Sequence, residues 1–67
     1  MNESKRLSED EREAAFADIR DKDPGRVVRG AKLLADDRGR STTTRLVALL
    51  DTETRIEVRR GVLYALA

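Results

Sequence analysis

The sequence predicts an all-α protein, and three observations carry this prediction. Apolar residues recur at intervals of three and four positions, which places them on one face of a helix. Residues typical of helix starts precede these apolar stripes. The second half of the chain also resembles the first half when Asp21 is aligned with Asp51. The alternation typical of β-strands extends nowhere over a useful length, so we expect helices throughout.

The first half of the chain is expected to form two helices. Ser8 and Glu11 have the spacing of a capping box, in which each side chain accepts an amide hydrogen at the helix start. The second helix is predicted to begin at Asp23, a capping residue followed by proline at the first helical position, and to end near Gly39. The apolar stripes of the two helices are Ala15, Phe16 and Ile19, and then Val27, Val28, Ala31, Leu34 and Ala35.

The second half repeats this arrangement. A short helix is predicted from about Thr43 to Leu50, with a hydroxyl of the threonines at 42–44 as its cap. Thr54 and Glu57 have the spacing of a second capping box and predict a fourth helix that continues to the end of the chain. The four helices are therefore expected to form two helical hairpins.

The two hairpins match in the alignment that places Asp21 on Asp51. Identical residues then lie at the pairs Asp21/Asp51, Val28/Val58, Arg29/Arg59, Leu33/Leu63 and Ala35/Ala65. In the second copy, the pattern L-x-x-L-L-D, a turn and then V-R is formed by Leu46, Leu49, Leu50, Asp51, Val58 and Arg59, and Ala65 and Leu66 complete it. This pattern resembles the short HEAT-like repeat of lyase-associated proteins, with copies at 14–37 and 44–67. The first copy departs from it at Arg20 and Asp36.

The resemblance implies a short α-solenoid of two hairpins. We expect a flexible tail at 1–7 and one domain at 8–67, with repeat one at 8–38 and repeat two at 42–67. In HEAT-like proteins, matching Asp and Arg residues form a structural ladder across the repeats. The residues at these positions here are Asp21, Arg29, Asp51 and Arg59.

The apolar end of the sequence predicts a contact surface. Solenoid repeats bury their apolar faces against neighbours, and two repeats that end in Tyr64-Ala65-Leu66-Ala67 leave one stacking face open. We expect a protein partner or a second copy to cover this face, unless the chain is the truncated end of a longer solenoid. The face is predicted to comprise Val62, Leu63, Tyr64 and Leu66.

A basic ridge gives the alternative function. The resemblance implies that second helices line a concave surface, and arginines there can contact the phosphates of a nucleic acid. Acidic residues share these helices, however, and no aromatic residue interleaves with the arginines for base stacking. The sequence therefore favours protein binding over nucleic-acid binding. The ridge residues are Arg26, Arg29, Arg55, Arg59 and Arg60.

Composition argues against catalysis. The chain has no cysteine and no histidine, which removes thiolate chemistry, most zinc sites and the commonest general base. No catalytic, cofactor-binding or metal-binding residue is therefore predicted, and we expect a non-catalytic scaffold or interaction module. The sequence has neither an apolar run long enough for a membrane span nor the apolar stretch of a signal peptide at its start, so a cytoplasmic location is expected.

Overall fold

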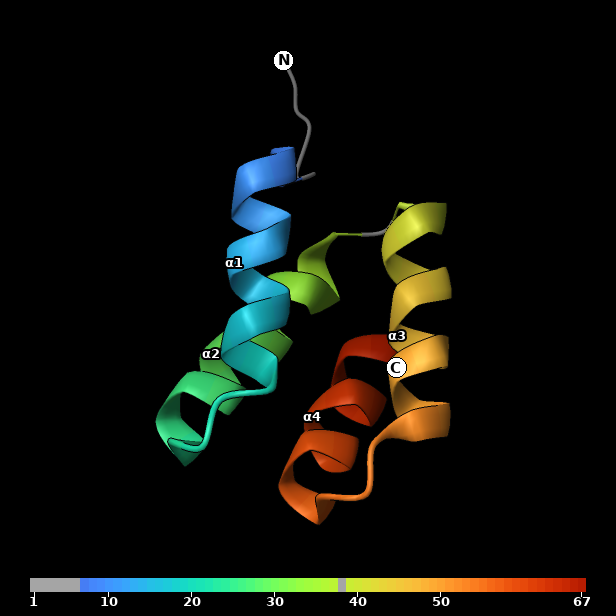
Figure 1. The fold of residues 1–67 in the computed structure, drawn as a ribbon. Coiled ribbons are helices and arrows are strands. Elements are labelled where there is room, and N and C mark those ends of the chain that lie inside the picture. Colours follow the sequence, from blue (N-terminus) through green and yellow to red (C-terminus); the bar gives the residue numbers. More distant parts are fainter. Residues whose placement is uncertain (1–6, 38) are drawn as a thin grey trace.

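The protein is all-helical in the part of the chain that the structure describes. The computed structural model describes residues 7–37 and 39–67. It contains helices α1 (Glu9–Ile19), α2 (Pro24–Asp36), α3 (Arg40–Thr52) and α4 (Ile56–Leu66), and no strand among these residues (Figure 1). The prediction of an all-α protein with four helices is confirmed. The predicted tail lies outside the described residues except for Leu7, which packs against the core.

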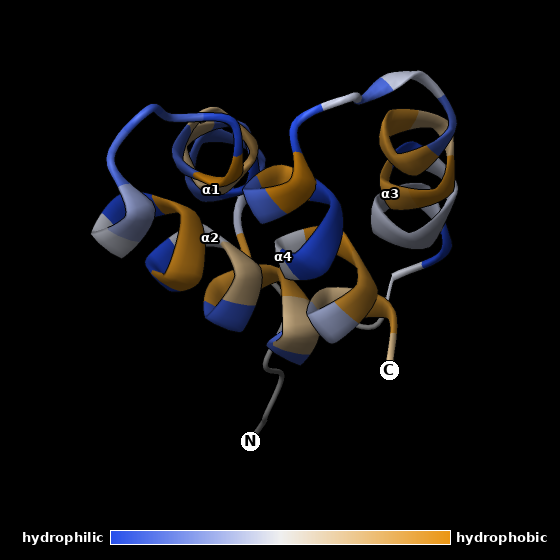
Figure 2. Cartoon of the chain, turned by 90° about the horizontal axis from the view of Figure 1, so that it is seen from below, coloured by the Kyte–Doolittle hydropathy of each residue, from blue (hydrophilic) through white to orange (hydrophobic). Residues whose placement is uncertain are grey.

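The four helices form two hairpins that meet along their second helices. Helix α1 packs on α2, α3 packs on α4, and a broad contact joins α2 to α4. A smaller contact joins α1 to α4. Viewed from below, α2 and α4 lie side by side, while α1 and α3 lie above them on opposite sides of the molecule (Figure 2). The α2–α4 contact is therefore the main connection between the hairpins.

The predicted starts of α1 and α2 are confirmed. The Ser8 hydroxyl accepts from the Glu11 amide at 3.1 Å, and the Glu11 carboxylate accepts from the Ser8 amide at 2.8 Å, so both halves of the capping box are present. The Asp23 side chain accepts from the Gly25 amide, and Pro24 is the first residue of α2. Both helices thus begin where local side-chain hydrogen bonds satisfy their first amides.

The starts of α3 and α4 differ from the predictions. Helix α3 begins at Arg40 instead of Thr43, and Gly39 is its N-cap, not the end of α2. Helix α4 has Arg55 as its N-cap without a side-chain cap, so the capping box predicted from Thr54 and Glu57 is wrong. The Arg55 amide instead donates to the Glu53 carboxylate at 3.1 Å, which fixes the turn before α4 by a different hydrogen bond.

The core contains side chains from all four helices. On α2 and α4, the buried positions correspond at a spacing that differs by one residue from the spacing of the sequence alignment. Val27 and Ala31 of α2 are buried and correspond in packing to Val58 and Val62 of α4, which are buried too. The alignment of Asp21 with Asp51 would instead match Val28 to Val58, but Val28 is 51% exposed and Val58 is 0% exposed. The Val28/Val58 identity in that alignment therefore does not mark an equivalent packing position. The full core is Ala15, Phe16, Ile19, Val27, Ala31, Leu34, Leu46, Val58 and Val62.

Gly30 lies where α1 and α2 approach most closely. A Cβ atom added to Gly30 would lie 2.6 Å from the Ala15 carbonyl oxygen and 2.6 Å from the Ile19 amide nitrogen. Both neighbours are backbone atoms of α1, which cannot rotate away as a side chain can. Only glycine allows the two helices to pack at this separation.

A buried aspartate joins the loop after α2 to two helices. Asp37 accepts from the Arg12 Nε at 3.1 Å, from the Thr42 hydroxyl at 2.8 Å and from the Gly39 amide at 3.1 Å. We call these four residues the Asp37 cluster. Burial alone would raise the pKa of the Asp37 carboxyl, but the hydrogen bonds from Arg12, Gly39 and Thr42 outweigh burial and hold the pKa below its ordinary value. Asp37 is therefore charged at neutral pH, and its carboxylate oxygens accept hydrogen bonds from Arg12, Gly39 and Thr42.

Candidate interaction surfaces

No hydrogen bond or ion pair joins an aspartate and an arginine of the predicted Asp–Arg ladder among the described residues. Arg29 pairs with Asp18, at 3.3 Å, because Asp18 lies on the last turn of α1 beside α2. Asp21 lies beyond the end of α1, where its carboxylate accepts from the Asp23 amide at 2.8 Å and lies 3.8 Å from Arg26. The first hairpin therefore has two short-range ion pairs in place of a ladder.

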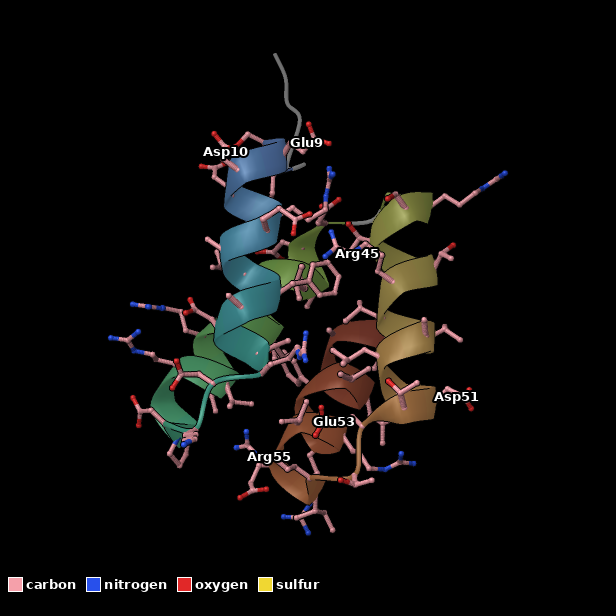
Figure 3. All side chains as sticks on the ribbon, viewed as in Figure 1. Glu9, Asp10, Arg45, Asp51, Glu53 and Arg55 are labelled. Atoms are coloured by element: carbon pink, nitrogen blue, oxygen red, sulfur yellow. The ribbon has the colours of Figure 1, made fainter. Side chains whose placement is uncertain are left out.

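In the second hairpin, Asp51 and Arg59 border the same shallow hollow, but no ion pair between them occurs among the described residues. The Nη1 of Arg59 donates to the carbonyl oxygens of Leu50, at 2.7 Å, and Glu53, at 3.1 Å. Asp51 is exposed and projects from the lower end of α3 (Figure 3). Arg59 thus binds the carbonyls at the end of α3, which favour a positive charge.

The predicted basic ridge is largely engaged within the chain. Arg55 extends from the start of α4 and donates to the carbonyl oxygens of Arg20, at 3.2 Å, and Asp21, at 3.1 Å. Arg26, Arg29 and Arg59 have the acceptors described above. Arg60 lies apart from them, on the wall of a groove between α2 and α4. Arg55 and Arg59 thus contact backbone carbonyls near the ends of α1 and α3, whereas Arg26 and Arg29 form exposed ion pairs.

The groove between α2 and α4 is apolar along its floor and charged at its edges. It has a volume of about 310 Å³, at the lower end of the range for small-ligand pockets. Figure 2 shows apolar segments of both helices next to each other along this contact. We call it the α2–α4 groove. Its lining residues are Pro24, Val27, Val28, Ala31 and Lys32 from α2, and Glu57, Arg60, Gly61 and Tyr64 from α4.

A second apolar surface lies on α3 and α4. Val47 is 53% exposed and Leu63 is 52% exposed, and both are large aliphatic side chains. Leu63 lies one helical turn after Arg59 on α4, so the two share one side of that helix. Arg59 in turn borders a shallow hollow with Val47, Leu50 and Asp51 of α3. We call this surface, formed by Val47, Leu50, Asp51, Arg59 and Leu63, the α3–α4 face.

The four residues of the predicted partner-binding face do not form one surface. Val62 is buried in the core, whereas Tyr64 is exposed in the α2–α4 groove. Leu63 belongs to the α3–α4 face, and Leu66 is half-buried against the core. The reason is helical geometry, because consecutive residues on a helix point about 100° apart. The spacing of Arg59 and Leu63, and of Val47 with Leu50 and Asp51, is the signal that sequence reasoning missed.

The chain gives no match to any protein-family model, to any curated protein or to any solved structure. The HEAT-like resemblance therefore depends on the repeat pattern alone. Within residues 7–37 and 39–67, no helix has both the length and the apolar character that crossing a membrane requires.

Arg45 is the polar link between the outer helices α1 and α3. Its guanidinium makes two hydrogen bonds to the Glu13 carboxylate, at 2.6 and 3.2 Å, and lies 4.0 Å from the centre of the Phe16 ring. Figure 3 shows Arg45 extending from α3 toward α1. The hydrogen bond from Arg45 lowers the pKa of the Glu13 carboxyl. One side chain thus combines an ion pair with a cation–π contact across the space between the hairpins.

Replacing Arg45 with methionine is expected to lower the free energy of unfolding, through loss of the cation–π contact, which contributes about 0.5 to 1 kcal/mol, and of the exposed ion pair with Glu13. Methionine keeps the length and apolar stem of the side chain. Urea unfolding followed by circular dichroism measures the change. Arg40→Met is the matched control, since Arg40 is exposed in the first turn of α3, where a positive charge is unfavourable. Equal losses in both variants would contradict a special role for Arg45.

Proposed function

We propose that the protein is a non-catalytic protein–protein interaction module with a HEAT-like, short-solenoid arrangement, and that it works through the α3–α4 face. Its contact with a second copy covers the exposed apolar residues of this face. The proposed module uses no cofactor or metal, and its action is binding.

One observation carries the proposal, which is the exposure of Val47 and Leu63 on the α3–α4 face. Val47 follows Leu46, the α3 residue that is buried in the core, and half of the surface of Val47 is exposed. Leu63 of α4 is exposed to the same extent. Such a surface is characteristic of a stacking face that another molecule covers.

Charge supports a second copy as the covering molecule. The α3–α4 face has one acidic residue, Asp51, and one basic residue, Arg59, beside its apolar side chains. In a two-fold symmetric dimer, the same surface of both copies meets itself, so a contact from one residue to another occurs twice. Asp51 of each copy would then face Arg59 of the other, with Val47 and Leu63 between them. The face is therefore complementary to itself in charge.

Sedimentation equilibrium over a wide concentration range tests this proposal. We expect a concentration-dependent dimer, which Leu63→Glu dissociates because the introduced carboxylate is buried without a partner at the interface. Val28→Glu is the matched control, since Val28 is similarly exposed but lies in the α2–α4 groove. It should leave the dimer intact. Circular dichroism of both variants checks that each remains helical.

Two outcomes would contradict the proposal. A folded monomer at all concentrations, with Leu63→Glu as soluble and as helical as the original chain, would remove the second copy as the covering molecule. A dimer that Val28→Glu dissociates and Leu63→Glu does not would place the contact in the groove instead.

The nucleic-acid alternative has no observation of its own in its favour. Arg55 donates to two backbone carbonyl oxygens, and Arg26 and Arg29 lie beside the acids Asp21 and Asp18, which offset part of the positive charge of the ridge. If the ridge bound phosphates, its affinity for nucleic acid would fall steeply as the salt concentration rises. The apolar α3–α4 face would show almost no such dependence, and it is the surface that we propose.

A further inference from the structure

We propose that the α2–α4 groove is a second binding site, which takes a peptide segment of another protein with one or two large apolar side chains next to acidic residues. This inference depends on the proposed function only in treating the chain as a binding module, because it uses a different surface. Three properties of the groove support it: the floor, the charge at its edges and its size.

The floor of the groove is apolar. Val27, Ala31 and Gly61 line its base, and Val28 and Tyr64 are exposed large side chains at its sides. Gly61 keeps the floor deep, since an added Cβ atom would lie only 3.2 Å from the Val27 Cγ1 of the opposite helix. Tyr64 presents an aromatic ring while its hydroxyl can stay in water, an arrangement that is common at the centre of protein interfaces. An apolar side chain inserted here would be desolvated on several sides.

The edges carry more positive than negative charge. Lys32 lies on the α2 side and Arg60 on the α4 side, and Glu57 is the acidic residue of the lining. No ion pair of Lys32 or Arg60 occurs among the described side chains, in contrast to the other basic residues of α2. Two cations on opposite walls favour a ligand with acidic groups on both sides of its apolar anchor. A basic segment would face Lys32 on one wall and Arg60 on the other, with Glu57 as the acidic residue of the lining.

The size of the groove limits what it holds. A volume of about 310 Å³ admits one or two large side chains and is too small to enclose a whole helix. Binding therefore depends on a few anchor residues that insert, with the remainder of the peptide above the groove.

Helix α1 of a second copy fits the groove poorly. It is one acidic segment that could match Lys32 and Arg60, and it carries Glu9, Asp10 and Glu13 at its start. The exposed apolar residues of α1 are Ala14 and Ala17, which are too small to act as anchors. Helix α1 of a second copy thus does not match both the charge and the size of the groove, and we propose a different protein as the ligand.

Selection from a library of random peptides of about 15 residues displayed on phage tests the inference. We expect enriched sequences to combine Phe, Leu, Met or Trp with Asp or Glu within one or two turns. A fluorescein-labelled peptide of the enriched sequence is then titrated with the protein, and its anisotropy gives the dissociation constant. Val28→Glu should weaken binding by about tenfold or more, because it places a carboxylate in the apolar groove.

Two further variants make the test specific. The double variant Lys32→Glu, Arg60→Glu should weaken binding of the acidic peptide and strengthen binding of the same peptide with lysine in place of its acids. Leu63→Glu should leave both affinities within about twofold, since Leu63 lies outside the groove. Leu63→Glu is therefore the matched control for Val28→Glu in the peptide experiment. In the dimer experiment, Leu63→Glu is the test and Val28→Glu is the control.

The result that overturns the inference is a library with no enrichment, or enriched peptides that lack acids or bind Val28→Glu as well as the original chain. A dimer lost in Val28→Glu would also overturn it, because a second copy would then occupy the groove. The two proposals fail separately. Loss of the dimer in Leu63→Glu supports the α3–α4 face whatever the peptides do, and peptide binding to a monomer supports the groove alone.

Discussion

Alanine in place of Gly30 is expected to lower the free energy of unfolding by about 3 kcal/mol, at the upper end of the cost of overpacking. The added methyl group would lie 2.6 Å from two backbone atoms of α1, so α1 and α2 must move apart. A domain of this length has roughly 3 to 10 kcal/mol of stability in total. The variant should therefore be largely unfolded or much more sensitive to urea. Circular dichroism during urea unfolding gives the value.

Gly25→Ala is the matched control for this change. Gly25 lies in the first turn of the same helix, and an added Cβ atom would meet only the Asp23 side chain, at the ordinary contact distance of 3.6 Å. Alanine there should stabilise the protein by about 0.5 kcal/mol, because it reduces the conformational freedom of the unfolded chain. Equal stabilities of the two variants would show that α1 and α2 do not pack as closely as described.

Alanine in place of Asp37 is expected to cost about 3 kcal/mol, which is typical of removing one partner of a buried ion pair. Arg12, with only 20% of its side chain exposed, would lose its carboxylate, and the Thr42 hydroxyl would lose its acceptor. Urea unfolding measures the loss. Asp36→Ala is the control, since Asp36 is exposed in the last turn of α2, where a negative charge is unfavourable. A similar loss in both variants would contradict the role of the Asp37 cluster.

The contribution of Asp37 should depend on pH. The pKa of its carboxyl is lowered in the folded protein, so the stabilisation is fully present above the ordinary value of 3.8 and is lost as the pH falls through the lowered value. Asp37→Asn removes this titration. The difference in stability between the original chain and Asp37→Asn should therefore be largest near neutral pH and shrink in acid. A constant difference at all pH values would contradict the lowered pKa.

Local signals in the sequence were reliable where the hydrogen bond they imply stays within a few residues. Ser8 with Glu11, and Asp23 with Pro24, mark the helix starts that the structure has. Thr54 with Glu57 has the same spacing but forms no cap, because the turn before α4 is fixed by Glu53 and Arg55 instead. A capping pattern is compatible with a helix start but does not ensure one. Neighbouring residues that form other hydrogen bonds can shift the start of the helix.

Contacts between distant parts of the chain were not predictable in the same way. Asp37 looks in the sequence like another surface acid, and nothing local indicates that the distant Arg12 reaches it. The alignment of Asp21 with Asp51 gives several identities, but on α2 and α4 the core follows the alignment of Val27 with Val58, since Val28 is exposed and Val58 is not. The two candidate surfaces follow from which side of α4 faces α2 and which faces α3. A list of apolar residues near the end of the chain does not contain this information.

The position of the Asp37 cluster has a consequence for how the chain folds. Gly39, the N-cap of α3, is held by Asp37, and Asp37 is held by Arg12 of α1. In most repeat arrays, each repeat has its own stability and contacts only its neighbours along the array. Here the start of the second hairpin depends on a residue of the first, so neither hairpin is a separate folding unit. We expect the described chain to unfold in a single cooperative step, without a state in which α3 and α4 persist after α1 has been lost.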